Sequence, residues 1–164
     1  MALNTFLVTG SSSGFGLSLV RLLLARGHNV IATSRNPSRT PSLVEEVNDH
    51  PSGRGKWLKL DVTAPQHTIN QTFDDAEKLF GPIDVLVNNA GYSVMGAVEV
   101  IDEDKARTQF DTNYWGVMRT IKAVLPGMRE KRRGVIVNVS SIGGLNSLAT
   151  SGVYGASKFA LEGE

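Results

Sequence analysis

The sequence predicts an α/β fold built on a parallel sheet, because short apolar segments alternate with longer segments of helical periodicity. Strands that are joined through helices form βαβ units with right-handed crossovers, and such units produce parallel sheets. The strands are expected at residues 5–9, 29–34, 56–61, 83–88 and 134–140. Helices are expected at residues 14–26, 41–48, 65–80 and 102–131, and a last helix begins near residue 152.

The first half of the chain marks the ends of its elements with glycine and with turn-forming residues. The strand at 5–9 runs directly into a glycine-rich loop. The helix at 14–26 carries leucine and valine at helical spacing, and Gly27 follows it as a typical stop signal. Residues 29–34 are rich in β-forming side chains. The polar stretch 35–55 is expected to be a surface loop around a short helix.

The second half of the chain continues this alternation. The helix at 65–80 is stopped by a Gly-Pro pair, since proline cannot continue a helix. Residues 102–131 read as one long helical region, with a bend expected at Pro126. The central strand segments are apolar on both faces, which is typical of strands that helices cover on each side.

Composition excludes several classes of function. The chain of 164 residues has a net charge of +1 and no cysteine. The near-neutral charge argues against nucleic acid or a membrane surface as a partner, and the basic run at 129–133 is interpreted as a solvated helix end. The lack of cysteine excludes disulfides and fits a reducing, cytoplasmic location. No apolar stretch is long enough to span a bilayer, and residues 1–164 are expected to form one domain.

The glycine-rich loop after the first strand predicts a nucleotide-binding site. Glycine there permits a tight turn and lets the backbone approach a pyrophosphate at the N-terminus of the next helix. Its G-x-x-x-G-x-G spacing departs from the common G-x-G-x-x-G fingerprint, so a simple turn is the alternative. The loop residues expected to contact a cofactor are Gly10, Ser12, Ser13, Gly14, Phe15 and Gly16.

The end of the second strand indicates NADP as the cofactor, with NAD as the alternative. NAD sites commonly place a carboxylate there for the ribose 2′-hydroxyl, whereas this strand ends Thr33-Ser34-Arg35. The guanidinium of Arg35, beside Ser34, can pair with a 2′-phosphate. Asp61, after the third strand, is a candidate acceptor for the adenine amino group. The alternatives are a solvated Arg35 and an Asp61 that only caps a turn or a helix.

Tyr154 and Lys158 are the strongest indication of chemistry. At a spacing of four residues on a helix, the two side chains share one face. A free tyrosine titrates near pH ~10, and a lysine cation beside it favours the phenolate. Such a pair is expected to act as an acid/base near neutral pH. An ordinary pair on a helix surface is the alternative.

These motifs together resemble the short-chain dehydrogenase/reductase family, in its shorter, non-extended branch. The family's patterns occur in the family's order over nearly the whole chain. The matching positions are the glycine loop at 9–16, Asp61-Val62, Asn88-Asn89-Ala90-Gly91, Asn113, Ser141, and Tyr154 with Lys158. The resemblance implies a Rossmann-like, doubly wound parallel sheet with the strand order 3-2-1-4-5 for the strands that are present.

The resemblance also implies roles for individual residues. Tyr154 would exchange a proton with the substrate oxygen, Lys158 would lower the pKa of that phenol and hold the nicotinamide ribose, and Ser141 would stabilise oxyanion charge. Ser140 is the rival of Ser141, but the spacing of thirteen residues to Tyr154 favours Ser141. Asn113 would hold a water in a proton relay to Lys158. Further cofactor contacts are implied at Asp61, Val62, Asn89, Ala90, Gly91 and, with an exposed position as the equal alternative, Lys122.

The function implied by the resemblance is hydride transfer between NADP(H) and a small-molecule carbonyl or alcohol substrate. No metal is expected, because His28, His50 and His67 are scattered and a nicotinamide carries the chemistry. A catalytically inactive nucleotide-binding fragment is the alternative function. The segment 92–100 carries apolar residues that either line a substrate pocket or pack internally.

Family members continue well beyond Lys158, with two further strands and a substrate-binding loop. The sheet is therefore expected to lack these C-terminal strands. The strand at 134–140 is expected to be an uncovered apolar edge, and the last helix is expected to bury little of its surface. Homodimers or tetramers of the family form through the long helix and the last helix, so a shortened last helix argues against such assembly here.

Overall fold

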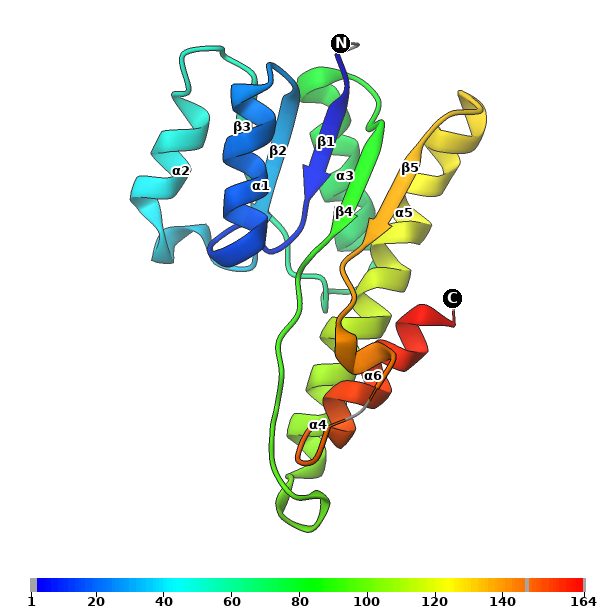
Figure 1. The fold of residues 1–164 in the computed structure, drawn as a ribbon. Helices are drawn as coiled ribbons and strands as arrows, with labels where there is room; N and C mark the ends of the chain where they lie inside the picture. Colours follow the sequence, from blue (N-terminus) through cyan, green and yellow to red (C-terminus); the bar gives the residue numbers. More distant parts are fainter. Residues whose placement is uncertain (1–2, 147, 164) are drawn as a thin grey trace.

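A central parallel sheet organises the computed structural model, which describes residues 3–146 and 148–163 (Figure 1). Its strands are β1 (Thr5–Val8), β2 (Asn29–Ser34), β3 (Gly55–Lys59), β4 (Val85–Asn88) and β5 (Val135–Asn138). The strand order is β3-β2-β1-β4-β5, and every neighbouring pair is parallel. The predicted fold class and strand order are confirmed.

Helices cover both faces of the sheet, and two more lie beyond the carboxyl ends of the strands (Figure 1). The helices are α1 (Gly14–Ala25), α2 (Pro41–Asn48), α3 (Gln66–Phe80), α4 (Glu103–Phe110), α5 (Gly116–Glu130) and α6 (Gly152–Glu162), with 3-10 turns at Pro37–Arg39, Val98–Val100 and Ile142–Gly144. On one face, α1 and α2 contribute Val20 and Val47 to an apolar cluster. On the other face, α3 and α5 contribute Phe73 and Val124 to a second cluster. Among the residues described, no helix is both long and apolar enough to cross a bilayer.

Three strands end earlier at their carboxyl ends than the sequence predicts. β1 ends at Val8, β3 at Lys59 and β5 at Asn138. The Thr9 N–H still donates to the Val87 carbonyl at 3.0 Å, and the Val139 N–H donates to the Asn88 carbonyl at 2.9 Å. Beyond these residues the neighbouring segments diverge. The diverging segments leave an open edge along the sheet, which is where ligand sites of parallel α/β sheets lie.

The long helical region is interrupted at Asn113, whereas the bend expected at Pro126 stays a prediction. A π-helical turn, Asp111–Trp115, joins α4 to α5 and places Asn113 in the interior, where it is 1% exposed. α5 continues through Pro126. Pro126 has no N–H to donate to the carbonyl of Lys122, four residues earlier. Both residues are exposed, so water can bind that carbonyl.

The last strand and the last helix differ in how well they are covered. β5 lies at the edge of the sheet, and its Val135 and Val137 are 54% and 43% exposed, as the predicted apolar edge requires. α6 packs more closely than predicted, because Ser157 and Lys158 are buried where the helix meets the π-helical turn and the Ile142–Gly144 turn. The prediction of a poorly packed last helix is therefore wrong for this face, although Phe159 is 46% exposed.

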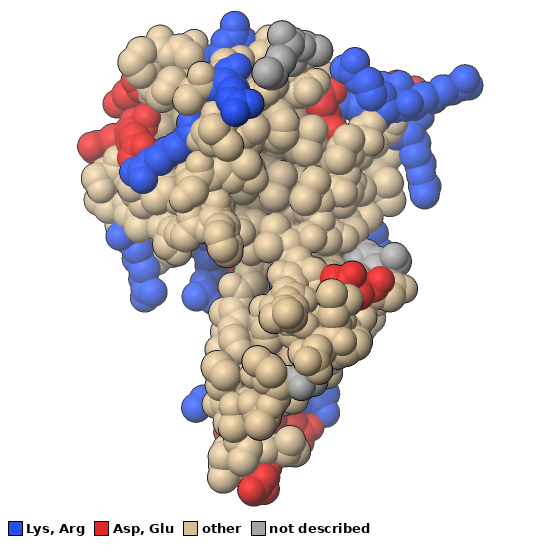
Figure 2. Space-filling model, viewed as in Figure 1, with Lys and Arg blue, Asp and Glu red and all other residues tan. Residues whose placement is uncertain are grey.

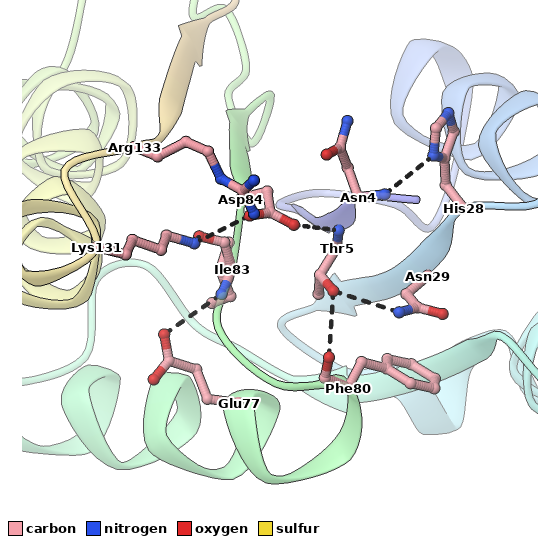
Figure 3. Close-up of polar contacts among 10 residues, drawn as sticks. All are labelled: Asn4, Thr5, His28, Asn29, Glu77, Phe80, Ile83, Asp84, Lys131 and Arg133. Carbon is pink, nitrogen blue, oxygen red and sulfur yellow. Dashed lines mark hydrogen bonds and ion pairs between the residues drawn. The ribbon is translucent and has the colours of Figure 1, made fainter. Parts of the chain in front are cut away.

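At the amino ends of the strands, Asp84 connects β1 to the turn between α5 and β5 (Figure 3). Its carboxylate accepts hydrogen bonds from the Thr5 N–H at 2.9 Å, Lys131 Nζ at 3.1 Å and the Arg133 guanidinium at 3.0 Å. The Asp84 side chain is 13% exposed. Burial alone would raise the pKa of this carboxyl, but the Thr5 N–H and the Lys131 ammonium hold the pKa below its ordinary value.

We expect Asp84→Asn to lower the free energy of unfolding by about 1–2 kcal/mol at neutral pH. Because the folded-state pKa of Asp84 is depressed, its contribution is present above the unfolded-state pKa of ~4 and is lost as the pH falls through the folded-state pKa. Urea denaturation at neutral and at acidic pH measures both effects. The control is Asp75→Asn, the same change in an exposed pair with Lys78, which should leave stability unchanged. A difference between wild type and Asp84→Asn that did not shrink in acid would contradict this account.

Candidate active site

A cleft of about 910 Å³ opens at the carboxyl ends of the strands, and the π-helical turn and α6 border it on the side away from the sheet. Loops that follow the strands and residues of α6 form its walls. Fifteen of the predicted site residues line it: Gly10, Ser12, Ser13, Gly14, Phe15, Ser34, Arg35, Asp61, Val62, Asn89, Ala90, Gly91, Ser141, Tyr154 and Lys158. Gly16, Asn113 and Lys122 are not among the lining residues.

The loop after β1 adopts a backbone conformation that glycine permits. Gly10 and Gly14 have φ angles of 70° and 55°, and a Cβ on Gly10 would lie 2.8 Å from the Cα of Ala90. The loop ends at the N-terminus of α1, and the side chain of its N-cap Ser13 makes no capping hydrogen bond with a described residue. The positive end of the α1 dipole therefore lies at the cleft, where it suits a phosphate.

Asn89 ties the loop after β4 to the loop after β1. Its Nδ2 donates to the carbonyls of Thr9 and Gly10, at 3.0 and 3.1 Å. The Thr9 hydroxyl in turn accepts the N–H groups of Asn89 and Ala90, both at 3.0 Å. A Cβ on Gly16 would lie 2.5 Å from Asn89 Nδ2, so Gly16 permits close packing behind the loop. Sequence reasoning did not assign Thr9 to the site, although its place in the glycine pattern was a usable signal.

The residues predicted to select the cofactor lie together at one end of the cleft. Arg35 is exposed at the end of β2. Ser34 lies beside it, but its hydroxyl accepts the indole N–H of Trp57 at 3.0 Å. Asp61 Oδ1 accepts the N–H and the hydroxyl of Thr63, at 3.0 and 2.7 Å. Asp61 thus caps a turn, as the alternative reading held, and it also lines the cleft.

Tyr154 and Lys158 lie on one side of α6, and both line the cleft. Lys158 Nζ is 6.0 Å from the centroid of the Tyr154 ring and donates to the carbonyl of Val139 at 2.7 Å. Lys158 is 6% exposed. Burial lowers the pKa of its ammonium, and the charge of Glu162 opposes that shift. The helix therefore holds a lysine at a fixed position beside the phenol, at some cost in desolvation.

Ser141 and Tyr154 both lie close to Gly143. Ser141 Oγ accepts the Gly143 N–H at 3.1 Å. A Cβ on Gly143 would lie 3.1 Å from the Tyr154 ring and 3.5 Å from Ser141 Oγ, so glycine lets this turn approach both side chains. Ser140 also lines the cleft, but its Oγ is buried against Gly144 and has no partner among the described residues. This placement favours Ser141 over Ser140 as the group beside Tyr154.

Asn113 lies behind the cleft and connects its walls. Asn113 Oδ1 accepts the Tyr92 N–H at 3.1 Å, and Nδ2 donates to the Tyr92 carbonyl at 2.9 Å and to Ser157 Oγ at 3.1 Å. The Ser157 hydroxyl donates to the Tyr154 carbonyl at 2.7 Å. A Cβ on Gly91 would lie 3.1 Å from Asn113 Oδ1. Asn113 therefore positions the loop after β4 relative to α6, and its role in a water relay stays a prediction.

Two further placements bear on the predicted site. Ser157, which sequence reasoning missed, is fully buried and links Asn113 to α6; its only signal in the sequence is its place beside Lys158. Lys122 is exposed on α5 and lies outside the cleft lining, which matches the alternative considered for it.

The family of the chain follows from its comparison with known proteins. The family profile described as short chain dehydrogenase matches residues 4–163. This chain belongs to the short-chain dehydrogenase family. The resemblance carried by the glycine loop and by Tyr154 and Lys158 is thereby confirmed at the level of the family.

Relatives of this short-chain dehydrogenase match nearly all of the chain. The 3-ketodihydrosphingosine reductase of Bacteroides thetaiotaomicron is 43% identical over 157 residues, which are 96% of this chain and 54% of the relative. The solved structure of a short-chain dehydrogenase from Streptomyces avermitilis has a TM-score of 0.89 at 37% identity. The match covers 99% of this chain and 58% of the Streptomyces chain. A closed form of serine dehydrogenase complexed with NADP+ has a TM-score of 0.88 at 33% identity. The match covers 97% of this chain and 62% of the serine dehydrogenase chain. The chain spans about half the length of the curated relatives that it matches.

Proposed function

We propose that the protein is an oxidoreductase that transfers hydride between NADP(H) and a carbonyl or alcohol substrate. The observation that carries the proposal is the convergence of Ser141, Tyr154 and Lys158 on the cleft that also contains the glycine loop. Membership of the short-chain dehydrogenase family supports a nicotinamide cofactor and a small-molecule substrate. One relative is, by its name, a reductase of a keto compound, and one solved relative is complexed with NADP+.

The cleft residues fit an extended dinucleotide. The N-terminus of α1 and the glycine loop offer N–H groups and a positive dipole to a pyrophosphate. Arg35 would pair with a 2′-phosphate at one end of the cleft, and Lys158 would hold the nicotinamide ribose at the other. When bound, the nicotinamide would supply or accept the hydride. The cleft volume, about 910 Å³, lies within the range of cofactor sites.

Proton transfer falls to the residues on α6 and after β5. In carbonyl reduction, the Tyr154 hydroxyl donates a proton to the oxygen that gains charge, and in alcohol oxidation the Tyr154 phenolate accepts the proton of the alcohol. The Ser141 hydroxyl hydrogen-bonds the same oxygen and stabilises its developing charge. Lys158, held by the Val139 carbonyl, stabilises the negative charge that donation leaves on Tyr154. Preorganised groups of this kind act with little reorganisation during the reaction.

Transfer of deuterium from C4-labelled NADPH to a carbonyl substrate tests this proposal. We expect mass spectrometry to find the label on the carbinol carbon of the alcohol that the purified protein forms. Heat-denatured protein provides the background. An alcohol formed without label would overturn hydride transfer. Binding of NADPH without any product would instead favour the alternative of an inactive nucleotide-binding protein.

We expect Arg35→Asp to weaken NADPH binding about tenfold or more and to shift the preference toward NADH, because it replaces a cation at a 2′-phosphate with a carboxylate. Dissociation constants for both cofactors, measured by fluorescence titration, check this. Arg39→Asp makes the same change of charge at an exposed residue outside the cleft lining and serves as the control. An unchanged ratio of the two constants in Arg35→Asp would show that Arg35 does not read the phosphate.

A further inference from the structure

We infer that the substrate is an uncharged alcohol or ketone with a large apolar chain or ring system on one side of the reacting carbon. This inference rests on the proposed function, since it concerns the substrate end of the same cleft. Two segments that flank the reacting groups carry it: residues 92–98, in the loop after β4, and residues 141–153, which lead from Ser141 to Tyr154.

Neither segment carries a charge. Residues 92–98 and 141–153 contain no Asp, Glu, Lys or Arg. Figure 2 shows that the visible face is mostly uncharged at the lower end of the molecule, where α4 and α6 lie in Figure 1. Lys and Arg gather at the opposite end. A carboxylate or phosphate of a substrate would lose hydration here and find no cation in either segment to replace it. The segments therefore select against charged substrates.

Large apolar side chains of these segments are turned out to solvent. The exposed fractions are 63% for Met95, 77% for Val98, 73% for Ile142, 72% for Leu145 and 62% for Leu148. Single exposed apolar residues are common on proteins, but several in two neighbouring segments indicate a binding surface. The apolar surface that these five residues provide would gain free energy on contact with hydrocarbon.

The two segments are joined, and each contributes residues to the cleft lining. The Gly96 N–H donates to the Thr150 carbonyl at 2.9 Å. A Cβ on Gly152 would lie 3.8 Å from Val98 Cγ2, which places Val98 beside the first turn of α6. Ser93 and Ser141, one from each segment, line the cleft itself. The exposed apolar side chains thus belong to the same two joined segments as the cleft residues Ser93 and Ser141, outside the cleft lining itself.

The segment after β4 is held in place from the interior. Gln109 of α4 is fully buried, and its Oε1 accepts the Val94 N–H. Asn113 holds the neighbouring Tyr92 through two hydrogen bonds. Because Tyr92 and Val94 are both held by these hydrogen bonds, Met95 and Val98 stay outside the core. They do so although burial of their apolar side chains would be favourable. An amphiphilic substrate satisfies both parts of this site, with its oxygen at Ser141 and Tyr154 and its hydrocarbon on the exposed side chains.

Three methyl ketones test the inference: butan-2-one, decan-2-one and 9-oxodecanoate, which is decan-2-one with a carboxylate in place of the terminal methyl group. We expect kcat/KM, measured by NADPH oxidation, to rise about two- to fourfold per added methylene along the alkyl series. The value for 9-oxodecanoate should be at least about tenfold below that for decan-2-one. A flat alkyl series, or equal use of 9-oxodecanoate, would overturn the inferred substrate class and leave the proposed function standing.

A pair of variants locates the effect. Leu145→Gln keeps the size of the side chain and should lower the ratio of kcat/KM for decan-2-one over butan-2-one by about fivefold. Leu22→Gln changes a residue of α1 that is 50% exposed outside the cleft lining, and it should leave the ratio unchanged. An unchanged ratio in Leu145→Gln would overturn the assignment of this surface. Loss of a dimer in Leu145→Gln, seen by sedimentation velocity, would also overturn it, because a second copy would then cover the surface.

Failure of the proposed function itself has a separate signature, which is no turnover of any of the three ketones. Displacement of the neutral dye Nile red from the NADPH-saturated protein then decides the inference. Displacement by decan-2-one but not by 9-oxodecanoate would support an apolar, uncharged ligand at this surface. Equal displacement by both ketones, or displacement by neither, would overturn it.

Discussion

Tyr154→Phe should lower kcat for carbonyl reduction by about 10³- to 10⁴-fold and leave the dissociation constant for NADPH within about threefold of wild type. The change removes the hydroxyl that donates the proton. It keeps the ring that packs beside Gly143, so the turn that carries Ser141 should hold its place. Steady-state kinetics with a saturating ketone and fluorescence titration with NADPH separate the two effects.

The matched control for this change is Tyr114→Phe. Tyr114 lies on the π-helical turn and outside the cleft lining. Its ring packs edge-on against the ring of Trp115, with 5.0 Å between the ring centroids. The loss of its hydroxyl should leave kcat within about twofold of wild type. A Tyr154→Phe protein that turned over as fast as Tyr114→Phe would reject Tyr154 as the proton donor, whatever its position in the cleft.

The features that could be predicted from the sequence depend on local spacing. A strand that leads into the glycine loop, and a helix that ends before Gly27, are signals within one or two turns of chain. The placement of Tyr154 and Lys158 on one side of α6 follows from helical geometry alone. The strand order did not follow from any such signal; the resemblance to a family supplied it, and the observed order β3-β2-β1-β4-β5 agrees with it.

The features that could not be predicted depend on contacts between distant residues. The helical pattern runs unbroken through Asn113, yet its buried amide bonds Tyr92, twenty-one residues away, and the backbone forms a π-helical turn there. The helix also continues through Pro126, where an exposed face leaves the carbonyl of Lys122 accessible to water. Gly16 matches the nucleotide pattern, and a Cβ there would lie 2.5 Å from both the Gly10 carbonyl oxygen and Asn89 Nδ2. A motif shows that glycine is needed and does not show which neighbour needs it.

Lys158→Met should lower kcat/KM by about 10²- to 10³-fold and at the same time leave the protein at least as stable as wild type at neutral pH. Methionine has a similar length and no charge, so it removes the cation and keeps the packing of α6. The substitution loses the stabilising hydrogen bond from Lys158 Nζ to the Val139 carbonyl. It also removes a buried ammonium, whose desolvation lowers the stability of wild type. Kinetics and urea denaturation on the same preparation measure the two effects.

The stability of the two proteins should also differ in its dependence on pH. Burial lowers the folded-state pKa of Lys158, so below that pKa the lysine is charged in both states and folding carries the full cost of desolvating it. Between the folded-state pKa and the unfolded-state value of ~10.4, the unfolded chain binds more protons, and the stability of wild type rises with pH. Lys158→Met should lack this rise, whereas Lys105→Met, a change at an exposed residue of α4, should keep it.

These outcomes distinguish a functional lysine from a structural one. If Lys158 served mainly to hold α6 against Val139, Lys158→Met would lose stability and activity together. If activity falls while stability is kept and the alkaline rise disappears, the folded protein retains a buried cation that opposes its own stability. Groups kept at a cost in stability are characteristic of active sites, because a charge placed for a transition state is seldom placed well for folding. That pattern would tie the position of Lys158 beside Tyr154 to proton transfer rather than to the packing of the helix.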